Sequence, residues 1–156
     1  MNVKPETKDA KAIGDLPVDD QRARVVRPQQ MPWDKMRFPG CETKTLLFDP
    51  NSGLATVLIK MAPGATLPDH EHVLIEQTYV LEGSLVDKEG PDAGLSVGPG
   101  EFVWRPAGSR HVAWCPQGGT MIAIFQVPNK FFESDGKVTD AGGKDWDSAW
   151  GHVLST

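Results

Sequence analysis

Turn-forming residues interrupt this sequence at short intervals, and no other feature restricts its fold as strongly. The 156 residues include 16 glycines and 13 prolines, which recur between short apolar runs. This spacing is typical of many short strands. Before Lys130, no stretch of about ten residues shows the apolar periodicity of a helix. With 39% hydrophobic residues, the chain can bury one core. We therefore expect an all-β fold, an antiparallel barrel or sandwich, in a single domain.

The clearest strand pattern lies in residues 41–61, CETKTLLFDPNSGLATVLIKM. It predicts two strands joined at DPNSG, whose Asp, Pro, Asn and Gly are typical of tight turns. Residues 74–87, LIEQTYVLEGSLVD, predict a second pair of this kind, in which the chain turns at Glu82–Gly83 and returns. Further strands are expected in residues 94–115 and 119–128.

The two ends of the chain differ from this middle part. Residues 1–30 are charged, contain proline and show no periodicity, so we expect an N-terminal arm. That arm is either a mobile tail or a segment that packs on its own barrel or on a partner subunit. The apolar stretch Val25–Trp33 favours contact for its last part. Near the C-terminus, Asp145 can cap a short helix that has Trp146 and Trp150 on one face.

Charge and composition limit the environment and the partners of the protein. A net charge of −5 argues against binding to nucleic acid or to an anionic membrane. No apolar run approaches the roughly 20 residues of a membrane span, and residues 1–17 do not resemble a signal or transit peptide. Cys41 and Cys115 lack the CxxC spacing of metal sites, and two cysteines do not predict a disulfide framework. We expect a cytoplasmic protein.

Three of the four histidines stand in a pattern that predicts a metal site. His70 and His72 are two positions apart, so on a strand both imidazoles point to the same face. Glu76 has the same parity, and His111 follows the turn of a separate strand pair. This nitrogen-rich set suits Fe(II), Mn(II), Zn, Ni or Co better than calcium, which prefers oxygen ligands. Glu76 is either a fourth ligand or a group behind the ligands, and His152 is expected on the surface.

The spacing of these residues resembles the two sequence motifs of the cupin superfamily. The first motif is filled by Gly64, His70, His72, Glu76 and Gly83. The second is filled by Gly100, Pro106, Gly108 and His111, and it departs only at its last position, where Cys115 replaces Asn. The resemblance implies a double-stranded β-helix, or jelly-roll, barrel over about residues 44–128 of a domain that spans 31–156. It also implies that His70, His72, Glu76 and His111 bind the metal.

Strand alternation predicts which residues surround the pocket above this metal. Val57, Ile59 and Met61 are expected to point inward, with Lys60 on the other face. Gln77 and Tyr79 are expected outside, whereas Phe102 or Trp104 is expected to cover the cavity. Arg105 and Arg110 could meet an acidic substrate, and Cys115 is expected to be a small inward residue whose thiol could sense oxidant. The predicted pocket consists of Val57, Ile59, Met61, Thr78, Phe102, Trp104, Arg105 and Cys115.

Longer segments of the sequence are similar to the ChrR-like cupin subgroup. They include LLFDPNSGLATVLIKMAPGATLPDHEH and YVLEGSLVDKEG. That subgroup includes the zinc-binding cupin half of certain anti-sigma factors. It also includes enzymes that are similar to acetylacetone-cleaving and 2,4'-dihydroxyacetophenone dioxygenases. The resemblance implies an oxidoreductase, an Fe(II) dioxygenase that cleaves a C–C bond in a β-diketone or hydroxy-ketone, with Glu76 as ligand or catalytic base.

Two other classes of function stay open on sequence grounds. One is a zinc-binding regulatory module, although residues 1–30 contain no His or Cys for the second zinc-binding half of an anti-sigma factor. The other is a metal-dependent isomerase, lyase or hydrolase. In each case we expect one divalent metal per subunit, with Zn, Ni or Mn as alternatives to Fe(II), and a small-molecule ligand, together with O2 for a dioxygenase. A homodimer is expected to cover an exposed strand edge and a surface with Trp33, Trp114, Trp146 and Trp150.

Overall fold

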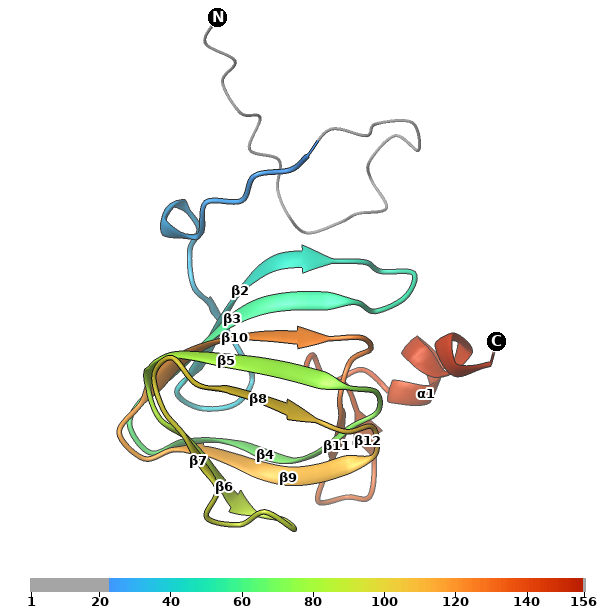
Figure 1. The fold of residues 1–156 in the computed structure, drawn as a ribbon. Helices are drawn as coiled ribbons and strands as arrows, with labels where there is room; N and C mark the ends of the chain where they lie inside the picture. Colours follow the sequence, from blue (N-terminus) through green and yellow to red (C-terminus); the bar gives the residue numbers. More distant parts are fainter. Residues whose placement is uncertain (1–22, 156) are drawn as a thin grey trace, which may run out of the picture.

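Two six-stranded antiparallel sheets face each other in the computed structural model, which describes residues 23–155 (Figure 1). The first sheet has the order β1 (Asp34–Lys35), β2 (Cys41–Phe48), β3 (Ala55–Met61), β10 (Gly119–Phe125), β5 (Glu76–Gly83), β8 (Phe102–Arg105). The second has the order β12 (Val138–Thr139), β11 (Lys130–Phe132), β4 (Ala65–His72), β9 (Ser109–Cys115), β6 (Leu85–Glu89), β7 (Ser96–Val97). This is the jelly-roll arrangement that the sequence predicts.

The first predicted hairpin is confirmed. β2 and β3 pair antiparallel, with Cys41 opposite Met61 and Phe48 opposite Ala55. Between them, the Asp49 carboxylate accepts hydrogen bonds from the Asn51 amide at 2.9 Å and from the Ser52 hydroxyl at 2.6 Å. A short Asp side chain that binds the backbone two residues on is the usual reason for Asp at the start of such a turn. Local chemistry therefore sets the geometry of this connection.

The second predicted hairpin is wrong, because β5 and β6 do not pair with each other. β5 pairs with β10 and β8 in one sheet, whereas β6 pairs with β9 and β7 in the other. The chain crosses between the sheets at Gly83, whose φ is +72° and where a Cβ atom would lie 2.0 Å from the Gly118 carbonyl oxygen. Only glycine fits such an approach without strain. The Glu82–Gly83 signal therefore marks a corner of the barrel.

The core lies between the sheets and is built from the alternate side chains of their strands. Ile59 and Met61 are buried there, as their parity predicts, and Val57 packs against the same cluster while partly buried. Val80 and Cys115 are fully buried. Within residues 23–155, no helix has the length and hydropathy of a membrane-spanning segment.

A short C-terminal helix is present, as predicted, and lies at one end of the barrel (Figure 1). α1 (Trp146–Trp150) is capped by the Asp145 carboxylate, which accepts a hydrogen bond from the Ser148 amide at 2.9 Å, and it continues into η3 (Gly151–Leu154). Trp146 and Trp150 pack with Val127 in a second apolar cluster. They are buried, so the expectation that they belong to an exposed Trp-rich surface is wrong: the face that carries both rings is the face that the helix buries.

The end of the N-terminal arm lies on the outer face of the first sheet. It contains η2 (Pro28–Gln30), and the Lys44 ammonium donates a hydrogen bond to the Pro28 carbonyl at 2.7 Å. The ammonium groups of Lys44 and Lys60 lie 4.6 and 4.4 Å from the ring centroid of Trp33, which allows cation–π attraction. The arm therefore contacts its own barrel from Pro28 to Trp33. The part of the predicted arm at residues 1–22 lies outside the described residues.

Candidate metal centre

Two neighbouring strands of the second sheet bring three histidines together inside the barrel. His70 and His72 lie on β4 and point to the same face, and His111 on β9 is the register partner of His70. All three side chains are buried. One ring nitrogen of each lies within 4.8 Å of the others, and the Nε2 atoms of His70 and His111 are 3.1 Å apart. Residues that the motif spacing selected are thus adjacent in space.

An oxygen atom lies close to the outer nitrogen, Nδ1, of each imidazole. The Nδ1 atom of His70 lies 2.7 Å from the Pro68 carbonyl oxygen, that of His72 lies 2.5 Å from Glu76 Oε2, and that of His111 lies 3.0 Å from Asp87 Oδ1. Such contacts fix the orientation of a metal-binding imidazole and leave Nε2 for the ion. The Nε2 atom of His72 is buried and has no hydrogen-bond partner. Three converging nitrogens, one of them without a partner, fit a divalent cation.

The protonation states also fit a cation. Burial, followed by the neighbouring His111 and His72, lowers the pKa of His70 to about 3. His70 is therefore neutral near pH 7, and a neutral imidazole has the free lone pair that a metal requires. For Glu76, burial alone would raise the pKa, but His72, His70 and the Thr78 hydroxyl lower it to about 2. Glu76 is thus ionised beside His72.

Glu76 lies behind His72 rather than among the converging nitrogens. Its Oε1 accepts a hydrogen bond from the Thr78 hydroxyl at 2.8 Å, and its Oε2 contacts His72 Nδ1 and accepts a 3.4 Å hydrogen bond from the Asn129 amide. Among residues 23–155, the group that could hold a metal consists of the three histidines alone. The sequence left two positions open for Glu76, that of a fourth ligand and that of a group behind the ligands. In the structure its carboxylate lies behind His72.

A buried ion pair that sequence analysis missed supports His111. The Arg105 guanidinium donates two hydrogen bonds to the Asp87 carboxylate, at 2.8 and 2.6 Å, and Asp87 Oδ1 also contacts His111. Burial alone would raise the pKa of Asp87, but His111 and Arg105 hold it below its usual value. The Arg105 guanidinium is therefore engaged within the protein. It does not face a substrate, which differs from the expectation that it could meet an acidic one. In the sequence, only strand alternation points to Asp87: it is two residues after Leu85 on β6, so both side chains point inward.

Several residues of the predicted pocket lie elsewhere. Phe102 and Trp104 are 54% and 58% exposed on the outer face of β8, because their neighbours Val103 and Arg105 take the inward positions of this strand. Thr78 is buried against Glu76. Arg110, the other candidate for an acidic substrate, pairs with Asp69 on the surface.

Cys115 is a small inward residue, as expected, but it lies in the core. Its thiol donates a hydrogen bond to the Met61 sulfur at 3.6 Å. Burial, with a smaller effect from Cys41, raises the pKa of the Cys115 thiol to about 12. A buried thiol that keeps its proton is inert toward oxidants, which react with the thiolate. His152 is exposed, as predicted.

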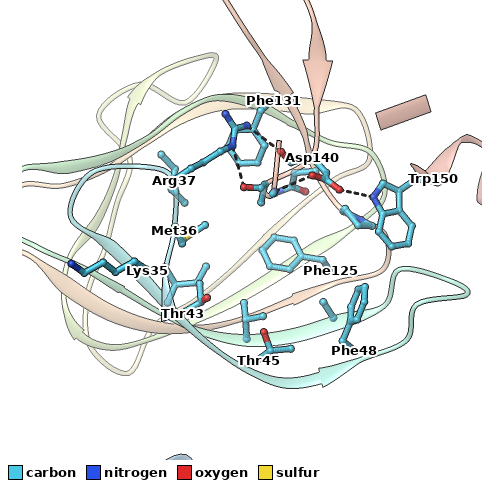
Figure 2. Close-up of a pocket in the computed structure, with 18 residues that line it drawn as sticks. Lys35, Met36, Arg37, Thr43, Thr45, Phe48, Phe125, Phe131, Asp140 and Trp150 are labelled. Carbon is cyan, nitrogen blue, oxygen red and sulfur yellow. Dashed lines mark hydrogen bonds between the residues drawn. The ribbon is translucent and has the colours of Figure 1, made fainter. Parts of the chain in front are cut away.

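A cavity of about 500 Å³ is lined by residues of both sheets and by Trp150 of α1, and none of the three histidines lines it (Figure 2). Of the predicted pocket residues, Val57 and Ile59 line it. The Phe131 ring lines the cavity and also stacks on His70, with 5.1 Å between the ring centroids, and Asn129 lines the cavity and bonds to Glu76. Sequence analysis missed both residues, because the short strand β11 and the turn before it show no alternation long enough to predict which side chains face inward.

Comparison with known proteins gives the same fold. The sequence-family model of the ChrR cupin-like domain matches residues 21–130 of this chain. A candidate acetylacetone dioxygenase from Methylibium petroleiphilum superposes with a TM-score of 0.67 and 21% identity, over 86% of this chain and 99% of that chain. The acetylacetone dioxygenase from Acinetobacter johnsonii gives a TM-score of 0.63 and 16% identity, over 98% and 99%. The search of curated proteins gives no match.

Proposed function

Since the chain belongs to the ChrR cupin-like family, we propose that it is a non-haem Fe(II) dioxygenase that cleaves a C–C bond in a β-diketone or hydroxy-ketone. One observation carries the proposal: the three converging histidines include a buried Nε2 without a hydrogen-bond partner, and the group contains no protein carboxylate. A centre with three imidazole ligands leaves coordination positions for a chelating substrate and for oxygen. The similarity to one acetylacetone dioxygenase structure and to one candidate acetylacetone dioxygenase points in the same direction.

In this proposal His70, His72 and His111 hold the iron, which supplies Lewis acidity and one-electron chemistry with oxygen. The rest of the work belongs to the protein. Glu76 orients His72, and the Arg105–Asp87 pair orients His111. The buried Phe131 ring, which stacks on His70, shields that side of the centre from water. One O2 is consumed for each C–C bond cleaved, and its two oxygen atoms end in the two products.

We assign Glu76 an orienting role rather than that of a base. A general base works best when its pKa lies near the working pH, whereas the pKa of Glu76 is lowered to about 2. Both carboxylate oxygens also have partners, the Thr78 hydroxyl on one and His72 with Asn129 on the other. A carboxylate that is engaged on both oxygens and weakly basic is suited to holding an imidazole in place.

Oxygen uptake tests the proposal. The full-length protein is reconstituted with Fe(II) without oxygen, and then mixed with oxygenated buffer that contains acetylacetone or a related diketone or hydroxy-ketone. Uptake that depends on both iron and substrate is expected. Iron-loaded protein that consumes no oxygen across such a panel would contradict the proposal, and zinc that is tightly retained without turnover would instead support a regulatory cupin.

Metal analysis tests the ligands separately. The replacement His72→Ala removes the buried nitrogen that lacks a partner, so most of the bound metal is expected to be lost after dialysis. His152→Ala is the matched control, because this histidine is exposed and lies outside the group of three. Equal metal content in both variants would show that the ion is bound elsewhere.

A further inference from the structure

We propose that the hydroxyl of Ser109 donates a hydrogen bond to the ligand atom that a ketone substrate, or a small anion in its place, brings to the metal. This inference rests on the proposed function, because it takes His70, His72 and His111 as the metal ligands. Ser109 is neither one of the motif residues nor one of the three histidines. The observation behind the proposal is a buried hydroxyl, without a hydrogen-bond partner in the described part of the chain, directly opposite His72.

Two register pairs on neighbouring strands form one inward patch. His70 on β4 lies opposite His111 on β9, and His72 lies opposite Ser109. On each strand the two residues are two positions apart, so all four side chains point to the same face of the sheet. Residues directly opposite each other have Cβ atoms about 4.5–5.5 Å apart. The three imidazoles stand at three corners of this patch, and Ser109 stands at the fourth.

Backbone hydrogen bonds hold Ser109 at this corner. Its amide donates to the Pro106 carbonyl at 3.1 Å, within the turn that precedes β9. The Gly108 amide donates to the His72 carbonyl at 2.7 Å and ties the same turn to β4. The Ser109 Cβ atom is therefore fixed relative to His72, and only rotation about the bond from Cα to Cβ moves its hydroxyl.

The Ser109 hydroxyl is buried, although the residue as a whole is partly exposed. Among residues 23–155 its Oγ has no hydrogen-bond partner, and the same holds for His72 Nε2. The buried hydroxyl of Thr78, by contrast, donates to Glu76 at 2.8 Å. Native proteins pair most of their buried polar atoms, and a catalytic or binding role is one of the reasons for an exception. Two such atoms on directly opposite residues therefore indicate a place where a ligand is bound.

The length of the serine side chain decides what its hydroxyl can contact. An imidazole extends well beyond its Cβ atom, whereas the serine Oγ is bonded to Cβ directly. The hydroxyl therefore ends short of the point on which the three imidazoles converge, and it can reach an atom bound to the ion rather than the ion itself. Because hydrogen bonds to ionised acceptors are the strong ones, this donor favours a ligand atom with negative charge. The enolate oxygen of a β-diketone has such a charge, and so does a small inorganic anion.

Azide binding to cobalt-loaded, full-length protein tests this inference without turnover. Azide is a small anion, and the visible spectrum of Co(II) reports its binding. Ser109→Ala should weaken azide binding by about 10- to 100-fold, because a hydrogen bond to a charged group is lost. The cobalt content should not change. Ser109→Thr keeps the hydroxyl and should retain most of the azide affinity, and Ser96→Ala is the matched control because Ser96 is exposed on β7.

Urea denaturation of the metal-free proteins tests whether the hydroxyl has a structural role instead. Ser109→Ala removes a hydroxyl that has no partner within residues 23–155, so this variant should unfold at no lower urea concentration than the parent. Thr78→Val removes a hydroxyl that is paired with Glu76, and it should unfold at a lower urea concentration.

Equal azide affinities in the parent, in Ser109→Ala and in Ser96→Ala would overturn the inference. Loss of cobalt together with azide binding, or a less stable Ser109→Ala protein, would also overturn it, because the hydroxyl would then support the protein rather than the ligand. The proposed function fails on a different measurement, the oxygen uptake of iron-loaded protein with ketones, so the two failures are distinguishable.

Discussion

At the scale of single residues, the surroundings of the histidines decide how each ring is held. Three different acceptors contact the three Nδ1 atoms: a main-chain carbonyl, the Glu76 carboxylate and the Asp87 carboxylate. Such groups behind the ligands raise ligand basicity and fix ring orientation, and their loss commonly costs about 10- to 100-fold in metal affinity or activity.

Glu76→Gln keeps the size of the side chain but removes its charge beside His72. If Glu76 orients this ligand, we expect metal affinity to fall by about 10- to 100-fold while the metal-saturated protein keeps measurable turnover. Competition with a chelator measures the affinity, and oxygen uptake at saturating iron measures kcat. An unchanged affinity with loss of kcat would instead identify Glu76 as a base.

Two Arg–Asp pairs, one buried and one exposed, allow a controlled comparison of stability. Arg105→Met leaves the Asp87 charge buried without its main partner, and breaking such a pair costs about 3–5 kcal/mol of unfolding free energy. Arg110→Met breaks the exposed pair with Asp69 and should cost about 0–1 kcal/mol. Urea denaturation of the metal-free proteins measures both. Similar losses in the two variants would contradict the structural role of the buried pair.

At the scale of elements, the crossing from β5 to β6 tests the topology. Gly83→Ala would place its Cβ atom against the Gly118 backbone in a left-handed conformation, so we expect a loss of more than about 2 kcal/mol of unfolding free energy. Gly94→Ala is the control, since Gly94 also has a positive φ but nothing lies within 4 Å of its Cβ position. That variant should lose about 1 kcal/mol. Equal losses would mean that the close approach at Gly83 is absent.

The sequence predicts those elements whose signals are local. The turn at Asp49 and the cap at Asp145 each depend on a side chain that binds the backbone two or three residues on, and both are found. The pairing of β6 depends on strands far along the chain, so Glu82–Gly83 could not distinguish a hairpin from a corner. The partners Asp87 and Arg105 meet only through tertiary packing and carry no motif. The three histidines could be predicted because the spacing of the two motifs is typical of residues that meet at one site in the folded protein.

At the scale of the whole molecule, pH should control the stability of the metal-free protein. In the unfolded chain His70 has its usual pKa of 6.5, whereas in the folded protein its pKa is about 3. Between these values the unfolded state binds more protons, so the free energy of unfolding decreases as pH falls below about 6.5. Denaturation at pH 7 and pH 5 measures this loss, which should be smaller in a His70→Asn variant. No difference between variant and parent would contradict a neutral, buried His70.

The outer face of the first sheet supports the proposal of a homodimer. β8 is an edge strand, and Phe102 and Trp104 on β8, with Tyr79 and Leu81 on β5, are exposed large apolar side chains. A second copy that pairs with this edge would cover both the strand and the patch. Light scattering should then give twice the 17.0 kDa mass of the chain, and Trp104→Lys should shift the mass toward one copy. A monomer at micromolar concentration would contradict the proposal.

The position of His70 opposite His111 has a consequence for the unfolded chain. These two residues are 41 positions apart in sequence, yet they are register partners on neighbouring strands. An ion held by both would close a loop of that length. The unfolded chain has no preformed site, so it releases the ion and regains the conformational entropy of the open loop. Unfolding therefore costs the free energy of metal binding. Metal binding in this protein should therefore raise the melting temperature and slow unfolding, in the manner of a cross-link that can be removed by a chelator.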